Sequence, residues 1–319
     1  MMTTPKKTGE KGIALIVVLC ITAVMVGAAV QMISQTRREV SETINLGDGL
    51  QALYLARSGI AFSKALLNAE ISDYNGLSQS WANAETWSAR FNASFEEGKS
   101  SIAIEDETGK IPINYMIKKD GVVNLAIRDL LVRLLNQPQW KLTEEQTEQI
   151  VNKLQDWMVK NSQQPLGSSE SKTNIKGPFR FPEEILKTEA ITKDLLFGTA
   201  NRPGLNSYIT IYGNGKININ TTPKPVLKAL FPGINEATLE RLDQFRHTEK
   251  DKLKDPNWFR QVIGTSGTNP PSDLIGVKSE AFRVTSTGLL KGCRRTAMGI
   301  LERDGNPEKF KLRFLLMNS

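Results

Sequence analysis

The first feature of the chain is an uninterrupted apolar run near its N-terminus. Residues 12–36 contain no Asp, Glu, Lys or Arg. A helix of about twenty apolar residues is long enough to cross the hydrocarbon core of a bilayer. The pattern therefore predicts a membrane-spanning helix over 13–36. Lys6, Lys7 and Lys11 precede the run, so this short leader is expected on the cytoplasmic side of the membrane.

A secretory signal peptide and a lipoprotein signal both fit this run less well. The run exceeds the apolar core of about 7–15 residues typical of a secretory signal peptide, and no Ala-x-Ala cleavage site follows it. A lipidated Cys20 would need small residues just before it, but Val17, Val18 and Leu19 stand there. The run is therefore interpreted as a membrane anchor.

Helical spacing of apolar residues continues beyond this anchor. The residues that recur at this spacing are Leu50, Leu53, Tyr54, Ile60, Ala61 and Leu67. Arg57 and Lys64 fall on the other face, so we expect an amphipathic helix that packs on a sheet. Gly47 and Gly49 predict a kink there, or a break between two separate helices, because glycine is unfavourable inside a helix.

Strand patterns occur on both sides of a long helical region. Ile102 and Ile104 alternate with small or polar residues, which indicates a strand, and 107–110 reads as a turn. Near the C-terminus, alternation predicts three further strands at 281–289, 294–302 and 309–316. The aromatic residues expected in the core before the first strand are Trp81, Trp87, Phe91 and Phe95.

The region between these strands is mainly helical in pattern. The expected helices cover 125–135, 144–159, a segment starting at Pro182, 223–231 and 236–245. Thr143 and Gln146 form a capping box for the second of them. A polar loop is expected over 161–178.

A short motif occurs twice in this region. The pattern Gly-Lys-Ile-x-Ile-Asn stands at 109–114 and again at 215–220. It suggests two similar junctions from strand to helix, with Asn114 and Asn220, or the threonines that follow, capping the helices.

Composition and charge narrow the class of protein. A chain with 39% hydrophobic and 24% charged residues is expected to be globular rather than disordered. The net charge of +7 is typical of a mixed solvated surface and only weakly suggests acidic partners. Cys20 and Cys293 are too far apart to imply a disulfide framework. His247 is the only histidine, which argues against a histidine metal cluster or a Ser-His-Asp triad, so no enzyme is predicted.

The junction of the charged leader and the apolar run resembles a known processing site. Gly12 followed by Ile13 is similar to the class III leader of type IV pilins and type II secretion pseudopilins, which is cut after the glycine. The fifth residue of the cut chain would be Val17, where most such subunits carry glutamate. Absence of this glutamate is typical of the protein K family of the type II secretion system.

Further segments in the same order strengthen this resemblance. They are Asp106–Asn114, Asp156-Trp157, Glu183–Leu186 and Ile217–Leu227. Together they resemble the protein K family over nearly the whole chain. The resemblance implies an α+β fold, with a long pilin-like N-terminal helix packed on an antiparallel sheet and a large all-helical domain inserted between strands.

The resemblance also implies domain boundaries. They are a leader at 1–12, a transmembrane helix at 13–36, a pilin-like helix and first strands at 37–112, an inserted domain of two subdomains at 113–275 and C-terminal strands at 276–319.

The function implied is that of a minor pseudopilin at the tip of a periplasmic pseudopilus. The expected partners are the prepilin peptidase, the minor pseudopilins I and J, other pseudopilins and the inner membrane, which the chain crosses once with its soluble part in the periplasm. Ile13 would become a methylated N-terminus. Assembly contacts are expected at Val17 and along the Leu53–Leu67 face, at Leu53, Tyr54, Ile60 and Leu67. A tip subunit has no neighbour to pair with an intramembrane carboxylate, which is costly without a partner.

Calcium is a further expectation from the resemblance. Family members are thought to hold calcium in the inserted domain, where carboxylate and amide oxygens suit this ion. The candidate ligands in this chain are Asp156, Asn161 and Glu170. Val159 and Asn161 occupy positions where further aspartates would be expected.

The segment 223–245 resembles a helix-hairpin-helix, a motif that can hold DNA phosphates through glycine N–H groups. Asn235 replaces the second hairpin glycine, and Glu236 and Glu240 would face the phosphates, so nucleic acid is not an expected partner. Two alternatives stay open from sequence. One is a minor pilin of a type IV or DNA-uptake pilus that contacts DNA near Lys228 and Gly233, and the other is a periplasmic calcium-dependent interaction module.

Replacing Gly12 should leave an uncut precursor, because the resemblance places the cleavage directly after this residue. An immunoblot that separates precursor from cut chain measures this. Normal processing of the Gly12 variant would contradict the assignment of the leader.

Overall fold

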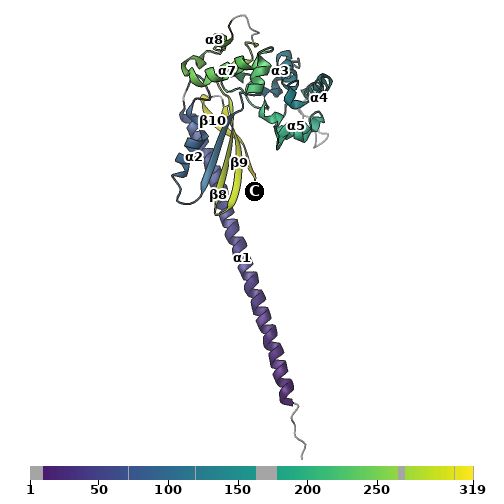
Figure 1. Ribbon diagram of the computed structural model, residues 1–319, viewed down its shortest axis with the longest axis vertical. Helices are drawn as coiled ribbons and strands as arrows, with labels where there is room; N and C mark the ends of the chain where they lie inside the picture. Colours follow the sequence, from purple (N-terminus) through teal and green to yellow (C-terminus); the bar gives the residue numbers. More distant parts are fainter. Residues whose placement is uncertain are drawn as a thin grey trace, which may run out of the picture.

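The computed structural model describes residues 10–70, 72–118, 120–162, 178–264, 270–304 and 306–318 of the 319. A single long helix, α1 (Glu10–Ala69), dominates its shape, as a rod that enters a globular part only with its outer half (Figure 1). At 1.5 Å per residue its 60 residues extend about 90 Å. The stretch from Ile13 is long and apolar enough to cross a membrane, with a mean hydropathy of 2.9 in its most apolar window, none of which is buried.

The expected kink or break near Gly47 and Gly49 is wrong, because α1 runs through both residues without interruption. Gly49 instead leaves room for the side chain of Arg295. A Cβ atom built there would lie 3.0 Å from Nη2 of Arg295, whose side chain crosses the helix at this point. A Cβ at Gly47 would meet nothing within 4 Å.

The outer half of α1 packs on one antiparallel sheet, as expected from the strand patterns. The strands are β1 (Lys99–Asp106), β8 (Ala281–Leu290), β9 (Cys293–Asp304) and β10 (Asn306–Asn318), in the spatial order β1-β8-β9-β10. β8 pairs with β1 through Ile102 opposite Ser286 and with β9 through Val284 opposite Gly299. The last three strands are contiguous in sequence, whereas β1 precedes them by more than half of the chain.

Small residues decide which face of α1 touches the sheet. The buried positions are Gly49, Ala52, Leu55, Ala56, Gly59, Ile60, Ser63 and Leu67. Leu50 and Tyr54, which the sequence assigned to this face, are 53% and 57% exposed. The face of α1 that packs on the sheet is the one whose small residues let the helix approach the strands most closely. A Cβ at Gly288 of β8 would collide with the carbonyl oxygen of Ala52.

Aromatic residues complete the core between α1 and the sheet. Trp81 lies in the short 3-10 helix η1 (Ser80–Ala82), and Phe91 lies in α2 (Ala84–Asn92), which covers β1. Both are buried, and the ring of Trp81 stands edge-on to Phe282 of β8 at 4.9 Å. Trp87 and Phe95, also expected in the core, are partly buried.

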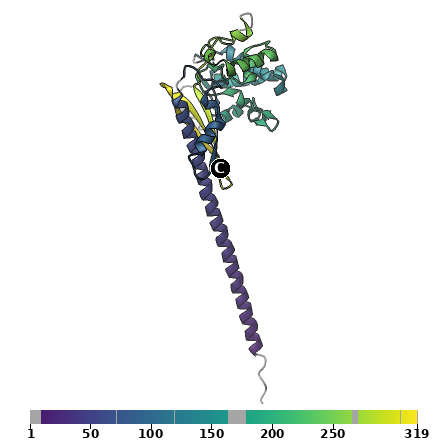
Figure 2. The same ribbon diagram turned by 60° about the vertical axis from the view of Figure 1, so that its left-hand side comes forward.

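A head domain is inserted between β1 and β8, at the end of the sheet away from the free part of the rod (Figures 1 and 2). Its α-helices are α3 (Leu125–Leu135), α4 (Glu144–Ser162), α5 (Lys193–Phe197), α6 (Lys224–Leu230), α7 (Glu236–Thr248) and α8 (Arg260–Ile263). Thr143 and Gln146 form the expected capping box of α4, with hydrogen bonds of 2.9 and 3.2 Å. The helix expected at Pro182 is a 3-10 helix, η4 (Pro182–Thr188).

The head is not purely helical in its described part. Further 3-10 turns are η2 (Ile113–Tyr115), η3 (Pro138–Trp140), η5 (Leu205–Ser207) and η6 (Lys250–Lys254). Two-residue strands form parallel pairs between β2 (Ile111–Pro112) and β5 (Ile209–Thr210) and between β6 (Ile217–Asn218) and β7 (Ile275–Gly276). An antiparallel pair joins β3 (Gly198–Thr199) and β4 (Arg202–Pro203). The two copies of the repeated motif therefore each enter a parallel pair.

Packing also joins the head to the second face of the sheet. The rings of Phe181, in the head, and Phe314, in β10, lie 5.2 Å apart. Ile300 of β9 belongs to the same buried cluster as Leu131 and Leu154 of the head. The sheet is thus covered by α1 on one side and partly by the head on the other.

Changing Gly288 to Ala should destabilise the protein, because the added Cβ collides with the backbone of α1. A cost of about 1–3 kcal/mol is typical of overpacking. Urea unfolding of the full chain in detergent, followed by tryptophan fluorescence, measures the change. Gly47→Ala is the matched control, with open space around the new Cβ and a gain of about 1 kcal/mol in helix propensity. Equal urea midpoints for the two variants would refute the close contact as the reason for glycine at 288.

Candidate functional site: the exposed rod and the polar junction below the head

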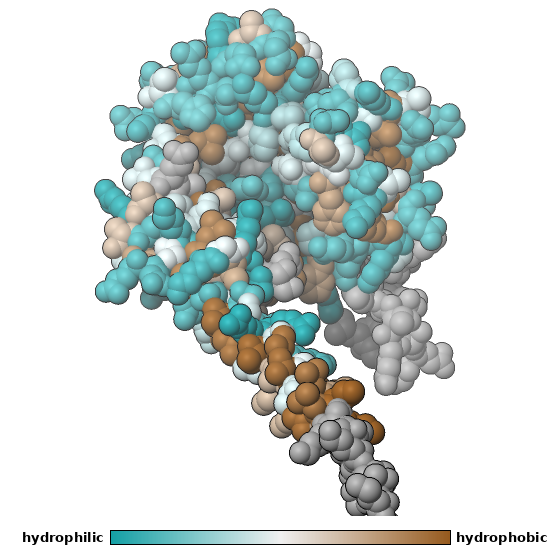
Figure 3. Space-filling model, turned by 60° about the horizontal axis from the view of Figure 1, so that its bottom comes forward, coloured by the Kyte–Doolittle hydropathy of each residue, from teal (hydrophilic) through white to brown (hydrophobic). Residues whose placement is uncertain are grey.

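The free half of α1 exposes its apolar side chains. Val17 is 49% exposed and Ile13 is 66% exposed, and large apolar residues remain exposed as far as Tyr54. In the space-filling view the rod shows apolar residues where it leaves the head, whereas the visible surface of the head is largely hydrophilic (Figure 3). Apolar surface of this extent marks a region that contacts lipid or other proteins.

One row of exposed apolar residues continues past the expected membrane segment. It consists of Ile33, Val40, Ile44 and Tyr54, each 52–57% exposed, and we call it the outer stripe. With 3.6 residues per turn these four fall within about a quarter of the helix circumference. They lie opposite Ala56, which faces the sheet. The outer stripe is therefore available to another helix from Ile33 to Tyr54.

The structure separates the residues expected to make assembly contacts. Ile60 and Leu67 are buried against the chain's own sheet, as the amphipathic pattern predicted, which leaves their side chains little surface for a partner. Leu53 is half-buried, whereas Val17 and Tyr54 are exposed. Gly12 and Ile13 lie at the start of α1, and the leader residues 1–9 lie outside the described part.

A buried carboxylate stands where β1 ends and the head begins. Asp106 accepts hydrogen bonds from Thr221 Oγ1 at 2.6 Å, Asn218 Nδ2 at 3.1 Å and Ser279 Oγ, and from the backbone N–H of Thr108 at 2.8 Å. Thr221 and Asn218 belong to the head, and Ser279 precedes β8. This one side chain therefore ties together the strand on which the head begins and the segment by which the chain returns to the sheet.

Burial outweighs these hydrogen bonds in setting the proton affinity of Asp106. Its pKa is raised above the ordinary 3.8, because desolvation disfavours the charged form more than the four hydrogen bonds favour it.

The adjacent Glu107 behaves in the opposite way. Burial alone would raise its pKa, but the Nζ of Lys110 lies 2.6 Å from its carboxylate and the Nε of Arg283 lies 2.9 Å away, and Thr210 donates a hydrogen bond of 2.6 Å. These contacts together hold the pKa of Glu107 below its ordinary 4.5. Glu107 therefore joins the head to the sheet, because it contacts Thr210 in the head and Arg283 in β8.

The asparagines of the repeated motif join distant segments. Asn114 donates from Nδ2 to the carbonyls of Phe179 at 2.9 Å and Ile211 at 2.8 Å. Asn220 donates to the carbonyl of Leu253 at 3.0 Å and accepts 2.8 Å from the indole N–H of Trp258.

The prediction that these asparagines cap helices is wrong, since η2 and α6 follow Pro112 and Pro223, which make no side-chain caps. Sequence reasoning also missed Asn75 and Ser279. Asn75 accepts from the N–H of Ser279 at 2.9 Å. Both residues stand in loops far apart in the sequence, and no local pattern predicts that they meet.

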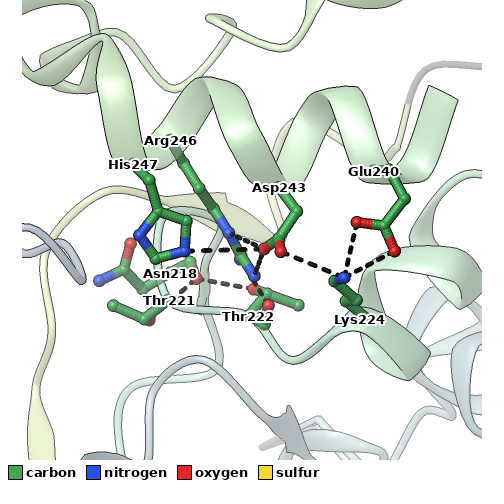
Figure 4. Close-up of polar contacts among 8 residues, drawn as sticks. All are labelled: Asn218, Thr221, Thr222, Lys224, Glu240, Asp243, Arg246 and His247. Carbon is green, nitrogen blue, oxygen red and sulfur yellow. Dashed lines mark hydrogen bonds and ion pairs between the residues drawn. The ribbon is translucent and has the colours of Figure 1, made fainter. Parts of the chain in front are cut away.

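The hairpin between α6 and α7 neutralises its own lysines. Lys224 pairs with Glu240 at 2.7 Å and with Asp243 at 3.3 Å, as Figure 4 shows, and Lys228 lies 3.5 Å from Glu236. A phosphate backbone would have to compete with these carboxylates. These ion pairs favour a role of the hairpin around Gly233 in packing two helices, and the absence of nucleic acid among the partners stays a prediction.

The described residues do not provide a calcium site. Asp156 is exposed on α4, while the side chains of Asn161 and Glu170 lie outside the described part. Within the described ranges no group of three or more His, Cys, Asp or Glu residues is placed to hold a metal. A lone carboxylate falls short of the six to eight oxygens that calcium takes. Calcium therefore stays a prediction.

Comparisons with known proteins give one consistent result. The family model described as type II secretion system (T2SS), protein K, matches residues 217–278. A protein of Pseudomonas aeruginosa named type II secretion system protein K is 23% identical over 309 residues, covering 93% of this chain and 90% of that protein.

A crystal structure of the GspK-GspI-GspJ complex from enterotoxigenic Escherichia coli contains a chain with the same fold. It aligns with a TM-score of 0.58 at 15% identity, over 87% of this chain and 99% of that one. Over most of its length the chain is therefore similar in sequence to protein K of the type II secretion system, and it shares the fold of a chain in the GspK-GspI-GspJ complex.

The location of the family match is informative. Residues 217–278 include β6, the hairpin and the segment just before Ser279. In this chain that region supplies Asn218, Thr221 and Asn220 to the junction. The part that the family model detects is therefore the part that fixes the head on the sheet, rather than the apolar rod.

Two neighbouring substitutions should change the pH dependence of stability in opposite directions. Asp106 has a raised pKa in the folded state, so its contribution is present at low pH and lost as pH rises through that pKa. Glu107 has a lowered pKa, so its contribution is present above pH 4.5 and lost as pH falls through the folded pKa. Relative to wild type, Asp106→Asn should therefore gain stability as pH rises from about 4, whereas Glu107→Gln should lose stability.

Urea midpoints of the full chain between pH 3 and 8 measure both slopes. Each variant is compared with wild type at the same pH, which removes effects of other titrating groups. Slopes of the same sign for the two variants would contradict the assigned environments.

Proposed function

We propose that this chain is a structural subunit at the tip of a type II secretion pseudopilus, rather than an enzyme. The observation that carries the proposal is the position of the head. It sits at the end of the sheet away from the free, apolar half of α1 (Figure 2). A rod that packs sideways with other rods would leave this head projecting above the assembly.

The apolar rod supports assembly within a membrane and a helical bundle. The N-terminal half of α1 is long and apolar enough to cross a membrane, and the outer stripe continues its apolar surface beyond that half. Burying such a side chain fully contributes about 1.5–3 kcal/mol. In this proposal the inner half is a single-pass anchor in the inner membrane, and the head lies in the periplasm.

Val17 fits the end position in such a stack. The fifth residue of the cut chain is a glutamate in most pilin-like subunits, where the resemblance implies pairing with a neighbour's N-terminal ammonium. A subunit without a neighbour above would leave this carboxylate unpaired in the membrane, at a cost of several kcal/mol. Valine at this position avoids the cost.

The proposed partners are minor pseudopilins I and J, other pseudopilins and the prepilin peptidase that would cut after Gly12. The crystal structure with the same fold is named as a complex of GspK with GspI and GspJ. We infer that Tyr54 and the rest of the outer stripe form the contact with the first two partners, because Ile60 and Leu67 are occupied by the sheet.

Changing Ile44 to Asp should disrupt the complex with minor pseudopilins I and J, because it places a charge in the centre of the outer stripe. Co-purification of the three proteins from detergent-solubilised membranes measures the complex, with a loss of about tenfold or more expected, as a buried unpaired charge costs over 1.4 kcal/mol. Leu46→Asp is the matched control, since Leu46 is 72% exposed and lies about a third of a turn away from the stripe. Equal retention by both variants would exclude the stripe as the interface.

The tip position has its own test. An epitope inserted beside Gly121, which lies exposed in the turn before α3 with φ of +81°, can be labelled with gold on isolated pseudopili. Label at one end of each filament is expected. Label distributed along the filaments would contradict the tip position while leaving the family assignment intact.

A further inference from the structure

A groove opens on the head between the first half of α4 and α5. These elements lie side by side on the part of the head away from α7 (Figure 1), and the groove between them has a volume of about 290 Å³. Pockets of about 300–1,000 Å³ are typical of sites for small ligands, so this groove suits a ligand group of one or two side chains. It lies apart from the rod and from the junction at Asp106.

Two residues that line this α4–α5 groove, Trp140 and Arg202, each carry a buried N–H donor without an acceptor among the described residues. Trp140, in η3, is 2% exposed, and its indole N–H has no hydrogen-bond partner among the described residues. The Nε of Arg202 is likewise buried and unpaired, while its Nη2 makes one long contact of 3.4 Å with the carbonyl of Asp194. A buried donor without a partner costs about 1–3 kcal/mol, so an acceptor from outside the chain that reached either donor through a small shift of its side chain would remove that cost.

The surroundings hold these donors in place. The guanidinium carbon of Arg202 lies 5.7 Å from the centre of the Trp140 ring, in a cation–π contact. Tyr208 packs edge-on against the same ring at 5.7 Å. The donors are therefore fixed by packing before any ligand arrives, which lowers the entropy cost of binding.

Charge and polarity define the ligand. The two charged side chains that line the groove, Lys153 and Arg202, are both cationic. Leu142, Ile150 and Leu195 supply an apolar wall. The groove thus offers donors and positive charge beside an apolar surface, which is complementary to a carboxylate next to an aliphatic side chain.

We propose that the α4–α5 groove binds an acidic segment of another polypeptide, with a carboxylate at Arg202 and Trp140 and an aliphatic side chain against Leu142, Ile150 and Leu195. Lys153, exposed at the rim, adds a second cation to the same site. A bare anion would use the donors but leave the apolar wall uncovered. This binding site is independent of membrane insertion and of the outer stripe.

Tryptophan resonances of the full chain in detergent micelles provide the test. The chain has five tryptophans, and Trp140→Phe identifies the indole signal of Trp140. The probe is the peptide Ala-Leu-Glu-Leu-Ala, acetylated and amidated, titrated beside the peptide with Gln in place of Glu. The Trp140 signal should shift and saturate with the acidic peptide, and the Gln peptide should bind at least tenfold more weakly.

Three variants sharpen the result. Arg202→Gln should lower the affinity for the acidic peptide at least tenfold. Lys153→Gln changes an exposed residue and should leave the fold intact. It should lower the affinity about threefold, because solvent screens the charge of Lys153. Arg241→Gln is the matched control, because Arg241 is exposed on α7 and bonds to Thr238 at 3.1 Å. It should bind like wild type.

Several outcomes overturn the proposal. The first two are an indole signal of Trp140 that does not change at millimolar acidic peptide, and a Gln peptide that binds as tightly as the acidic peptide. The third is an Arg241→Gln variant that weakens peptide binding as much as Lys153→Gln does. The fourth is inorganic phosphate that shifts the Trp140 signal as much as the acidic peptide does. The last would indicate a simple anion site. None of these results bears on tip assembly, which is measured by co-purification and gold labelling.

Discussion

An apolar helix that its own chain does not cover is the constraint on which the rest of this structure depends. About half of α1 presents aliphatic side chains to its surroundings, and water is an unfavourable environment for them. The chain must therefore place this half in lipid or among other helices. The outer half of the same helix is different, because Ala52, Ala56 and Gly59 bring it into close contact with the sheet. One continuous helix thus joins a part that needs partners to a part that is already folded.

Rigid attachment of the head follows from a second set of contacts. The neighbouring carboxylates of Asp106 and Glu107 are both buried at the point where β1 passes into the head. One is held by neutral donors and the other by two cations, and both sets of contacts include segments far away in sequence. Leaving either carboxylate without its partners would cost several kcal/mol, so the head and the sheet are expected to move as one unit. A head that projects above a bundle of rods needs such an attachment if it is to keep a fixed orientation.

The two copies of the short motif show what a local pattern can and cannot specify. Both copies enter a two-residue parallel strand pair, as their similarity suggested. Their asparagines, however, reach across to backbone carbonyls of remote segments instead of capping the next helix. The side chain of an asparagine suits both tasks, and the choice between them depends on which carbonyls tertiary folding brings within reach. Gly49 is a similar case, since a glycine inside a helix can signal a bend or a close neighbour, and Arg295 is the neighbour.

The sequence by itself determined an apolar run long enough to span a membrane, the four strands of the sheet, the capping box at Thr143 and the order of segments that resembles the protein K family. These features depend on local periodicity, on hydropathy or on residues close together in the chain, so they can be read without coordinates. Only the tertiary structure decided which face of α1 meets the sheet, since Tyr54 and Ile60 fit the same helical pattern and only the small residues around Ile60 allow close packing. It also decided the partners of Asp106 and the unpaired donors of Trp140 and Arg202. Their environments are formed by residues distant in sequence, and burial, which sets their energies, exists only once the chain has folded.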